Sequence, residues 1–208
     1  MHGPGVGSHA TPDPKRQAIL RYARKAFVSD GYAATKIEPI AREAGVSTAT
    51  LYALFDGKAQ LFSAVIEDAA EDFARQMAGV GAFEGDARQQ LISFAEAYAG
   101  FMGDPFVRSI FRLVMAERPR FQPVARRFFE HGQVTFGATL IGILKAQSAA
   151  GALKPIERPS RAAGHLMGMI EHPVFFVPLV TGDEIAVRRT NAEIVEDAVD
   201  TFMARYGA

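Results

Sequence analysis

The 208-residue sequence contains no cysteine and lacks several other features of secreted or membrane proteins. Without cysteine there are no disulfides and no thiolate metal ligands, as expected for a chain that works in a reducing cytoplasm. Residues 1–12 lack the charged and apolar segments of a signal peptide and are typical of a flexible lead-in. The longest apolar runs, 134–144 and 174–180, are shorter than the roughly 20 residues of a membrane span. We therefore expect a soluble, cytoplasmic protein with no membrane partner.

The motifs that catalysis or metal binding would need are also absent. We find no phosphate-binding glycine loop after a strand, no nucleophile elbow, no zinc-protease helix and no paired carboxylates beside a base. His165 and His172 are seven residues apart on an expected helix. That separation is about 10 Å, too far for the two to share one ion. We expect no catalytic site, no metal and no cofactor, with a helical enzyme as the less favoured alternative.

Net charge is lacking too, because 23 Lys and Arg balance 23 Asp and Glu. The balance is uneven along the chain. Residues 13–60 hold eight basic and five acidic residues, a net of +3, and the remaining length holds fifteen and eighteen, a net of −3. The segment 13–60 is therefore the part that we expect to meet an anionic partner.

Helical periodicity dominates what the sequence does contain. Apolar residues recur at helical spacing from Lys15 to Asp30, where Gly31 ends the run. Thr35 can cap a second helix over 36–44, since a proline in its first turn is tolerated. A long helix is expected over 58–78, after Gly57.

Between these helices, Gly45 supplies a left-handed turn and Ser47 can cap a third, short helix that runs to about Leu54. Two helices joined by a glycine turn are typical of a helix-turn-helix. The apolar residues that must meet over the first helix are Ile40, Ala41, Ala44, Val46, Leu51 and Phe55. Once these face inward, the hydroxyl-rich face of the third helix is left outside.

The rest of the chain predicts a second helical unit. Helices are expected near 86–102, 104–116, 121–150, 158–171 and 184–206. The fold class is therefore all-α, with an N-terminal three-helix helix-turn-helix domain over 13–60. A long helix joins it to a C-terminal helical domain over 61–208.

Residues 18–62, "AILRYARKAFVSDGYAATKIEPIAREAGVSTATLYALFDGKAQLF", resemble the tetracycline-repressor (TetR) family of bacterial transcriptional regulators. Many positions of different chemistry agree in register, among them Gly31-Tyr32, Ala44-Gly45-Val46-Ser47 and Leu51-Tyr52. The later stretch 111–132 is similar to one branch of the family's ligand-binding regions.

The resemblance implies that the third helix is a recognition helix for the major groove of a double-stranded DNA operator. Thr48, Ala49 and Thr50 match positions where the family reads bases, and Tyr52 and Lys58 match positions where it grips phosphates. The full set of expected DNA contacts is Thr35, Lys36, Ser47, Thr48, Ala49, Thr50, Tyr52 and Lys58. Ala53 and Leu54 depart from the family's aromatic or histidine pair, which we expect to remove one phosphate contact.

The second domain is rich in aromatic residues, which favours a concave, mostly apolar effector site. The alternative is that these residues form an ordinary core. Polar residues in the same helices, including Glu171, are informative because burial without a partner costs about 1–3 kcal/mol. We expect the effector to contact Phe94, Tyr98, Phe101, Phe111, Arg112, Met115, Gln133, Phe136, His165 and Met169.

The apolar run Phe175-Phe176-Val177 is interpreted as part of an interface. Together with a face of the last helix it would bury against a second copy of the chain, through Ile194, Val195, Ala198, Val199 and Phe202. The resulting hypothesis is a homodimeric, ligand-responsive transcriptional regulator, most simply a repressor that a small hydrophobic effector releases from a palindromic operator. An architectural DNA-binding protein without an effector is the main alternative.

Overall fold

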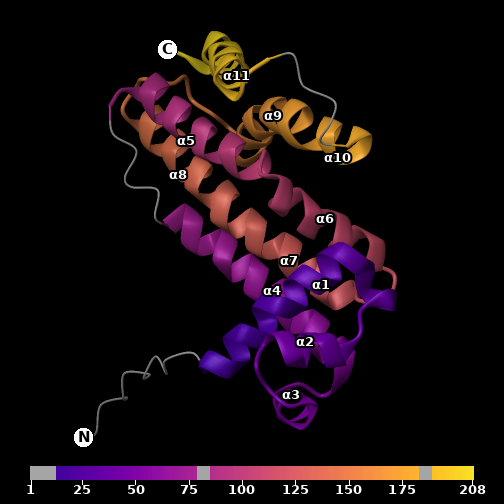
Figure 1. Cartoon of the computed structure of the whole chain (residues 1–208). Coiled ribbons are helices and arrows are strands. Elements are labelled where there is room, and N and C mark those ends of the chain that lie inside the picture. Colours follow the sequence, from indigo (N-terminus) through magenta and orange to yellow (C-terminus); the bar gives the residue numbers. More distant parts are fainter. Residues whose placement is uncertain (1–12, 79–84, 183–188) are drawn as a thin grey trace, which may run out of the picture. The chain divides into compact units, whose positions relative to one another are not determined.

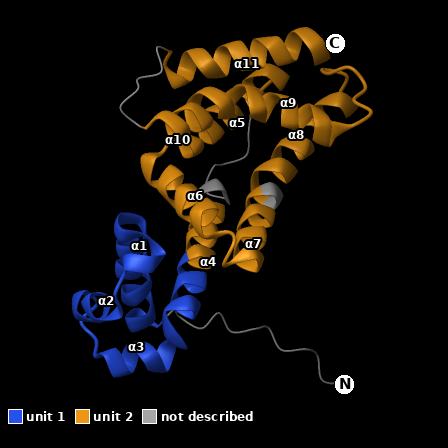
Figure 2. Cartoon of the chain, turned by 90° about the vertical axis from the view of Figure 1, so that its right-hand side faces the viewer, with its two compact units in different colours: residues 1–65 blue, residues 66–208 orange. Residues whose placement is uncertain are grey.

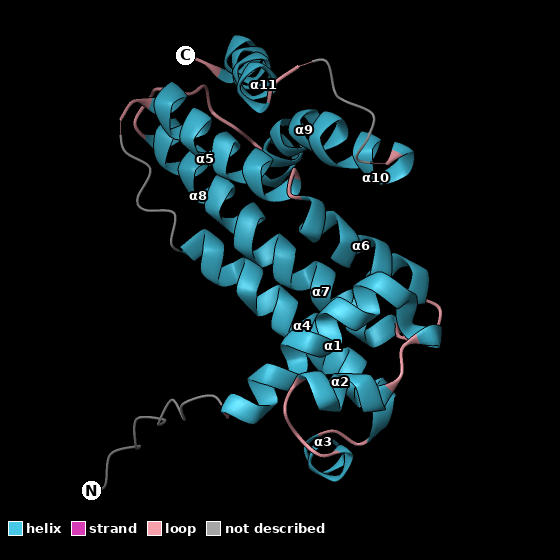
Figure 3. Cartoon of the chain, in the orientation of Figure 1, coloured by secondary structure: helices cyan, strands magenta, loops and turns pink. Residues whose placement is uncertain are grey.

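A computed structural model describes residues 13–78, 85–182 and 189–208 (Figure 1). Within these ranges the side chains of 76–78 and 133–134 are not described. The expected lead-in at 1–12, and the first residues of the expected helix at 184–206, lie outside them. The described residues are helical and contain no strand, only an isolated antiparallel bridge between Leu153 and Gly207 (Figure 3). The all-α fold class is confirmed.

The chain divides into two compact units, residues 1–65 and residues 66–208 (Figure 2). The division falls after residue 65, where the sequence suggests residue 60. Helix α4, Gly57–Ala78, contributes residues to both units. Each unit has its own buried core.

Unit 1 contains α1 (Pro14–Ala34), α2 (Ile37–Glu43), α3 (Thr48–Leu54) and the start of α4. Its core forms as the apolar register predicts, since Phe27, Ile40, Leu51 and Phe55 are at most 2% exposed. The rings of Phe27 and Phe62 meet edge to face at 5.3 Å between centroids. With Leu51 buried, α3 presents its opposite face to solvent.

The turn between α2 and α3 forms as the sequence predicts. Gly45 has a φ of 69°, a left-handed conformation that is strained for any residue with a Cβ. Ser47 caps α3, because its hydroxyl accepts a hydrogen bond from the Thr50 backbone N–H at 3.1 Å. Both predictions are confirmed.

Thr35 plays a different part from the one predicted. The N-cap of α2 is Lys36, and Thr35 instead closes α1, where its hydroxyl donates to the carbonyls of Gly31 at 2.6 Å and Ala26 at 3.2 Å. Gly31 has left-handed φ at 74°, so the α1 carbonyls near it lack their regular helical donors. A threonine hydroxyl satisfies them, and the predicted capping of α2 by Thr35 is wrong.

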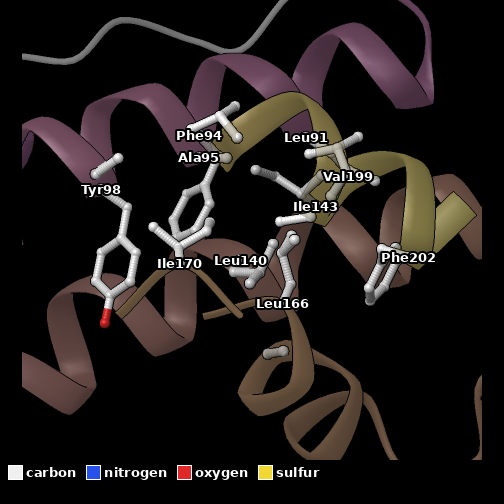
Figure 4. Packing of buried hydrophobic residues seen from close by; sticks show 14 of the residues in the cluster. Leu91, Phe94, Ala95, Tyr98, Leu140, Ile143, Leu166, Ile170, Val199 and Phe202 are labelled. Atoms are coloured by element: carbon white, nitrogen blue, oxygen red, sulfur yellow. The ribbon is translucent and has the colours of Figure 1, made fainter. Parts of the chain in front are cut away.

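Unit 2 is built around α5, which packs against α8, α9 and α11 (Figure 1). Its core holds large apolar side chains from all four helices, including Leu91, Leu140, Leu166 and Phe202 (Figure 4). The helices of unit 2 after α4 are α5 (Ala87–Met102), α6 (Pro105–Glu117), α7 (Gln122–Gly132), η1 (Gln133–Gly137), α8 (Ala138–Ala149), α9 (Pro159–Glu171), η2 (His172–Phe176), α10 (Val177–Thr181) and α11 (Asn191–Tyr206).

Two short π-helices, η1 and η2, interrupt the helices that the sequence predicts as regular. The expected helix over 121–150 is α7 and α8 joined through η1, and the expected helix over 158–171 continues through η2 into α10. The run Pro159–Thr181 thus has 23 residues, and its most apolar 18-residue window has a mean hydropathy of 1.2, so it is long and apolar enough for a membrane span by length and composition alone. Only 28% of its most apolar window is buried within the chain.

The last helix corrects the expected dimer interface. Ile194, Val195, Ala198, Val199 and Phe202 are at most 4% exposed, and they pack into the core of their own unit against α5 and α9. A face already buried within the chain is not available to a second copy. The prediction that these α11 residues bury against a partner is therefore wrong.

Candidate DNA-binding and effector sites

The outer face of α3 carries the hydroxyl-bearing side chains. Thr48 and Ala49 are exposed in the first turn, and Thr50 is half-buried. Tyr52 is 53% exposed, whereas its neighbour Leu51 is fully buried. This face combines hydroxyl donors with a methyl surface, the groups that contact base edges and phosphates in a DNA groove.

Ser47 fixes the start of this face. Its hydroxyl lies 2.9 Å from the Thr50 hydroxyl as well as accepting from the Thr50 N–H. A seven-residue helix is too short to be stable on its own, so the cap and the packing of Leu51 hold it in place. These contacts engage the hydroxyls of Ser47 and Thr50, whereas the hydroxyl of the exposed Thr48 stays open to solvent.

The two lysines expected at phosphates lie in different environments. Lys36 is exposed beside α2. Lys58 is half-buried: its ammonium donates to the Ala33 carbonyl at 2.9 Å and lies 4.8 Å from the centroid of the Tyr32 ring. It thereby supports the C-terminal end of α1 and keeps further N–H groups for another acceptor. Thr35 is 3% exposed, so its hydroxyl faces the interior of unit 1.

Unit 2 contains a cavity of about 740 Å³, within the usual range for small-molecule sites. Its walls come from the second half of α4 and from α5, α6, α7, η1, α8, α9 and η2. Both π-helices border it, through Phe136 of η1 and Phe175 of η2. Single π turns inside α-helices often occur at functional sites.

Seven of the aromatic rings that line the cavity form an unbroken series of contacts. From Tyr98 the series passes through Phe136, Phe101, Phe73, Phe128 and Phe111 to Phe175. Neighbouring centroids are 4.8–6.2 Å apart and most pairs are edge to face. Such a wall favours a flat or apolar ligand body.

A carboxylate interrupts the aromatic lining. Glu171, the last residue of α9, accepts a hydrogen bond from the hydroxyl of Tyr98. Tyr98 stands at the edge of the core cluster and its oxygen points away from Phe94 (Figure 4). Burial, and then the charge and hydrogen bond of Glu171, raise the pKa of the Tyr98 hydroxyl far above its usual range. Tyr98 therefore stays protonated and remains a donor to Glu171.

The structure brings four of the residues expected at the effector site into the cavity lining: Tyr98, Phe101, Phe111 and Phe136. Phe94 lies behind them, fully buried and stacked on Tyr98 at 5.9 Å. Met169 packs against the core of unit 2. The side chain of Gln133 is outside what the structure describes.

The remaining expected residues do not line the cavity. Arg112 is exposed and donates to the Ser109 hydroxyl, and Met115 is 50% exposed. His165 is exposed and its Nδ1 lies 3.2 Å from the Tyr206 hydroxyl. For these residues the structure offers no route to the aromatic cavity, and effector binding by any of the ten stays a prediction.

The expected effector contacts leave out four rings of the lining and one buried charge. The four rings come from α4, α7 and η2, and they are Phe73, Phe128, Phe129 and Phe175. Arg108 is 5% exposed, and its guanidinium donates to the backbone carbonyls of Gly103 and Val174. It ties the start of η2 to the α5–α6 junction. Arg108 lies one helical turn before Arg112 on the same face of α6, so the sequence pattern does not distinguish them. In the structure Arg108 is buried and Arg112 is exposed.

Comparison with protein families gives matches to both units. A family model described as "Bacterial regulatory proteins, tetR family" matches residues 19–65, and one described as "AefR-like transcriptional repressor, C-terminal domain" matches residues 89–208. Among curated proteins, the HTH-type transcriptional activator FasR of Mycolicibacterium smegmatis is 31% identical over 96 residues, which are 46% of this chain and 44% of FasR. That match spans less than half of the relative's length.

Solved structures resemble the chain over most of its length. A TetR-family transcriptional regulator from Mesorhizobium loti MAFF303099 is 27% identical with a TM-score of 0.82, covering 93% of this chain and 97% of that one. The flavonoid-responsive regulator FrrA is 26% identical with a TM-score of 0.74 and the same coverage. With a helix-turn-helix in unit 1 and a helical second unit, the chain belongs to the TetR family of bacterial transcriptional regulators.

Proposed function

We propose that this TetR-family regulator is a homodimeric repressor that a small aromatic effector releases from a palindromic operator. The observation that carries the proposal is the aromatic cavity of about 740 Å³ in unit 2. An architectural DNA-binding protein would have no use for such a cavity. The match of unit 2 to the C-terminal domain of AefR-like repressors supports repression, and the name of the related FrrA supports a planar aromatic effector.

The DNA contacts that we propose are those of the exposed face of α3. Thr48, Ala49 and Thr50 would meet base edges, and Tyr52 would meet a phosphate, with Ser47 fixing the start of the helix. Lys36 and the free N–H groups of Lys58 would add phosphate contacts. Thr35 would act indirectly, by holding the end of α1 from which α2 begins.

The dimer would form through the exposed apolar side chains of η2 and α10 and not through the buried face of α11. Phe176 is 52% exposed and Val180 is 66% exposed, four residues apart on one face. They belong to the run Pro159–Thr181, which is apolar yet mostly unburied within the chain. A second copy is the natural cover, because two-fold pairing presents two recognition helices to the two halves of a palindrome.

Release would follow from differential affinity. An effector that binds better to the conformer with badly spaced recognition helices shifts the population toward that conformer. It lowers the affinity for the operator by the same factor by which the operator lowers the affinity for the effector. Helix α4 is the candidate connection, since Phe73 in its second half lines the cavity while Lys58 in its first turn belongs to unit 1.

A promoter fusion tests this function. A reporter gene placed behind the DNA upstream of the gene for this chain should fall in expression when the chain is supplied, and a Tyr52→Ala variant at equal abundance should not lower it. Aromatic small molecules should restore expression with the wild type. Expression that rises with the wild type would make the protein an activator, as FasR is named. Expression that does not respond to the protein at all would refute the proposal for this DNA.

A further inference from the structure

Glu171 has hydrogen-bonding capacity that the protein leaves open. Its Oε1 accepts from the Tyr98 hydroxyl. Within the described ranges no group donates to its other oxygen and no cationic side chain pairs with it. Glu171 nevertheless lines the cavity and is only partly exposed. A carboxylate held this way has one oxygen ready for a donor that comes with a ligand.

The charges around the cavity are of one sign. Of the described lining residues, Glu130 and Glu171 are acidic, none is Lys or Arg, and His131 is the one histidine. A carboxylate-bearing or phosphate-bearing ligand would meet repulsion here and would find no arginine to bind it. The lining therefore disfavours anions.

The rings beside Glu171 add to this preference. The faces of aromatic rings carry negative charge density and attract cations. The centroid of the Phe136 ring lies 5.1 Å from that of Tyr98 and 4.8 Å from that of Phe101. The wall next to the carboxylate is therefore a continuous aromatic surface. Phe175 stands four residues after Glu171 on the same run of helix and also lines the cavity.

We infer that the cavity takes an organic monocation: an aromatic or apolar body that carries one ammonium group, with the ammonium on Glu171. This rests on the proposed function, in which the cavity is the effector site. An apolar body that fills the cavity removes water from Glu171, and a carboxylate without water or a counter-charge is strongly unfavourable. A ligand ammonium restores the lost interaction with the open oxygen, and a neutral ligand restores only part of it.

Three probes with one ring system test the inference on the full-length protein without DNA. They are 9-(aminomethyl)anthracene, which is cationic at neutral pH, 9-anthracenemethanol, which is neutral, and 9-anthracenecarboxylate, which is anionic. Their fluorescence gives a Kd for each. Wild type should bind the cation at least tenfold more tightly than the anion, with the alcohol between them. Glu171→Gln should weaken the cation about tenfold and leave the alcohol within threefold.

Glu130→Gln is the matched control, because it removes the same charge from an exposed lining position. It should change cation binding less than threefold. Tyr98→Phe frees Oε1 of Glu171 but keeps the carboxylate, so this variant should keep the cation preference. It keeps the inference testable if the Glu171 variant folds poorly. Equal binding of the three probes, binding of none, a preference for the anion, or a cation preference that survives Glu171→Gln would overturn the inference. No DNA is present in these titrations, so they test the ligand preference alone. The reporter assay tests the repressor proposal separately.

Discussion

Replacement of Phe202 by alanine tests whether the apolar face of α11 belongs to the core of its own chain or to the dimer interface. Phe202 is 1% exposed, and its ring meets that of Tyr206 at 4.6 Å inside the core of unit 2. Truncation of a fully buried phenylalanine costs about 3–5 kcal/mol, from lost burial and the cavity left behind. For a domain of this size we expect the melting temperature to fall by roughly 10 °C. The dimer dissociation constant should stay close to that of the wild type at temperatures where the variant is folded.

Phe176→Ala is the control, because it removes the same ring from an exposed position of η2. It should change the free energy of unfolding of the monomer by less than about 1 kcal/mol and should weaken dimerisation at least tenfold. Thermal unfolding followed by circular dichroism measures the first quantity and sedimentation equilibrium the second. A Phe202→Ala variant that melts like the wild type but is monomeric would refute the assignment of α11 to the core of its own chain.

Three further outcomes follow from single contacts. Ser47→Ala removes the cap of α3 and should lower the stability of unit 1 by about 1 kcal/mol in urea unfolding, whereas Ser47→Thr should restore most of it. Tyr52→Phe should weaken operator binding about fivefold by anisotropy while leaving the melting temperature unchanged; equal isotherms would remove Tyr52 from the contacts. Hydrogen bonds from the Thr190 backbone N–H and hydroxyl lower the pKa of Glu193, so its contribution to stability is present at neutral pH and is lost as the pH falls through that depressed pKa. The stability difference between wild type and Glu193→Gln should therefore shrink below about pH 4 in thermal melts, and a difference that does not change with pH would contradict the capping role.

The helix-turn-helix was predictable because its signals are local. The left-handed turn at Gly45, the cap at Ser47 and the burial of Leu51 each depend on residues within one or two helical turns. Thr35 shows the limit of such reasoning. A threonine between two helices can satisfy the end of the first or the start of the second, and the choice depends on the break at Gly31.

The cavity was only partly predictable because it depends on packing between distant helices. Periodicity marks Phe94 and Phe101 alike as inward-facing, yet Phe94 is buried in the core while Phe101 lines the cavity. The π-helices have no clear sequence signal, and η2 changes which side chains of its run face the cavity. The partner of Glu171 comes from 73 residues earlier in the chain, so no spacing rule could find it.

The most direct test of the account is a fluorescence-anisotropy titration of the full-length protein against its own upstream intergenic DNA and a scrambled duplex, at two salt concentrations. The account predicts tight binding to the intergenic DNA that saturates at one or two dimers per site, with the scrambled duplex at least a hundredfold weaker. Affinity should fall steeply with salt for both, because phosphate contacts contribute to each. Weak and equal binding to the two duplexes would contradict sequence-specific recognition by α3 at this DNA.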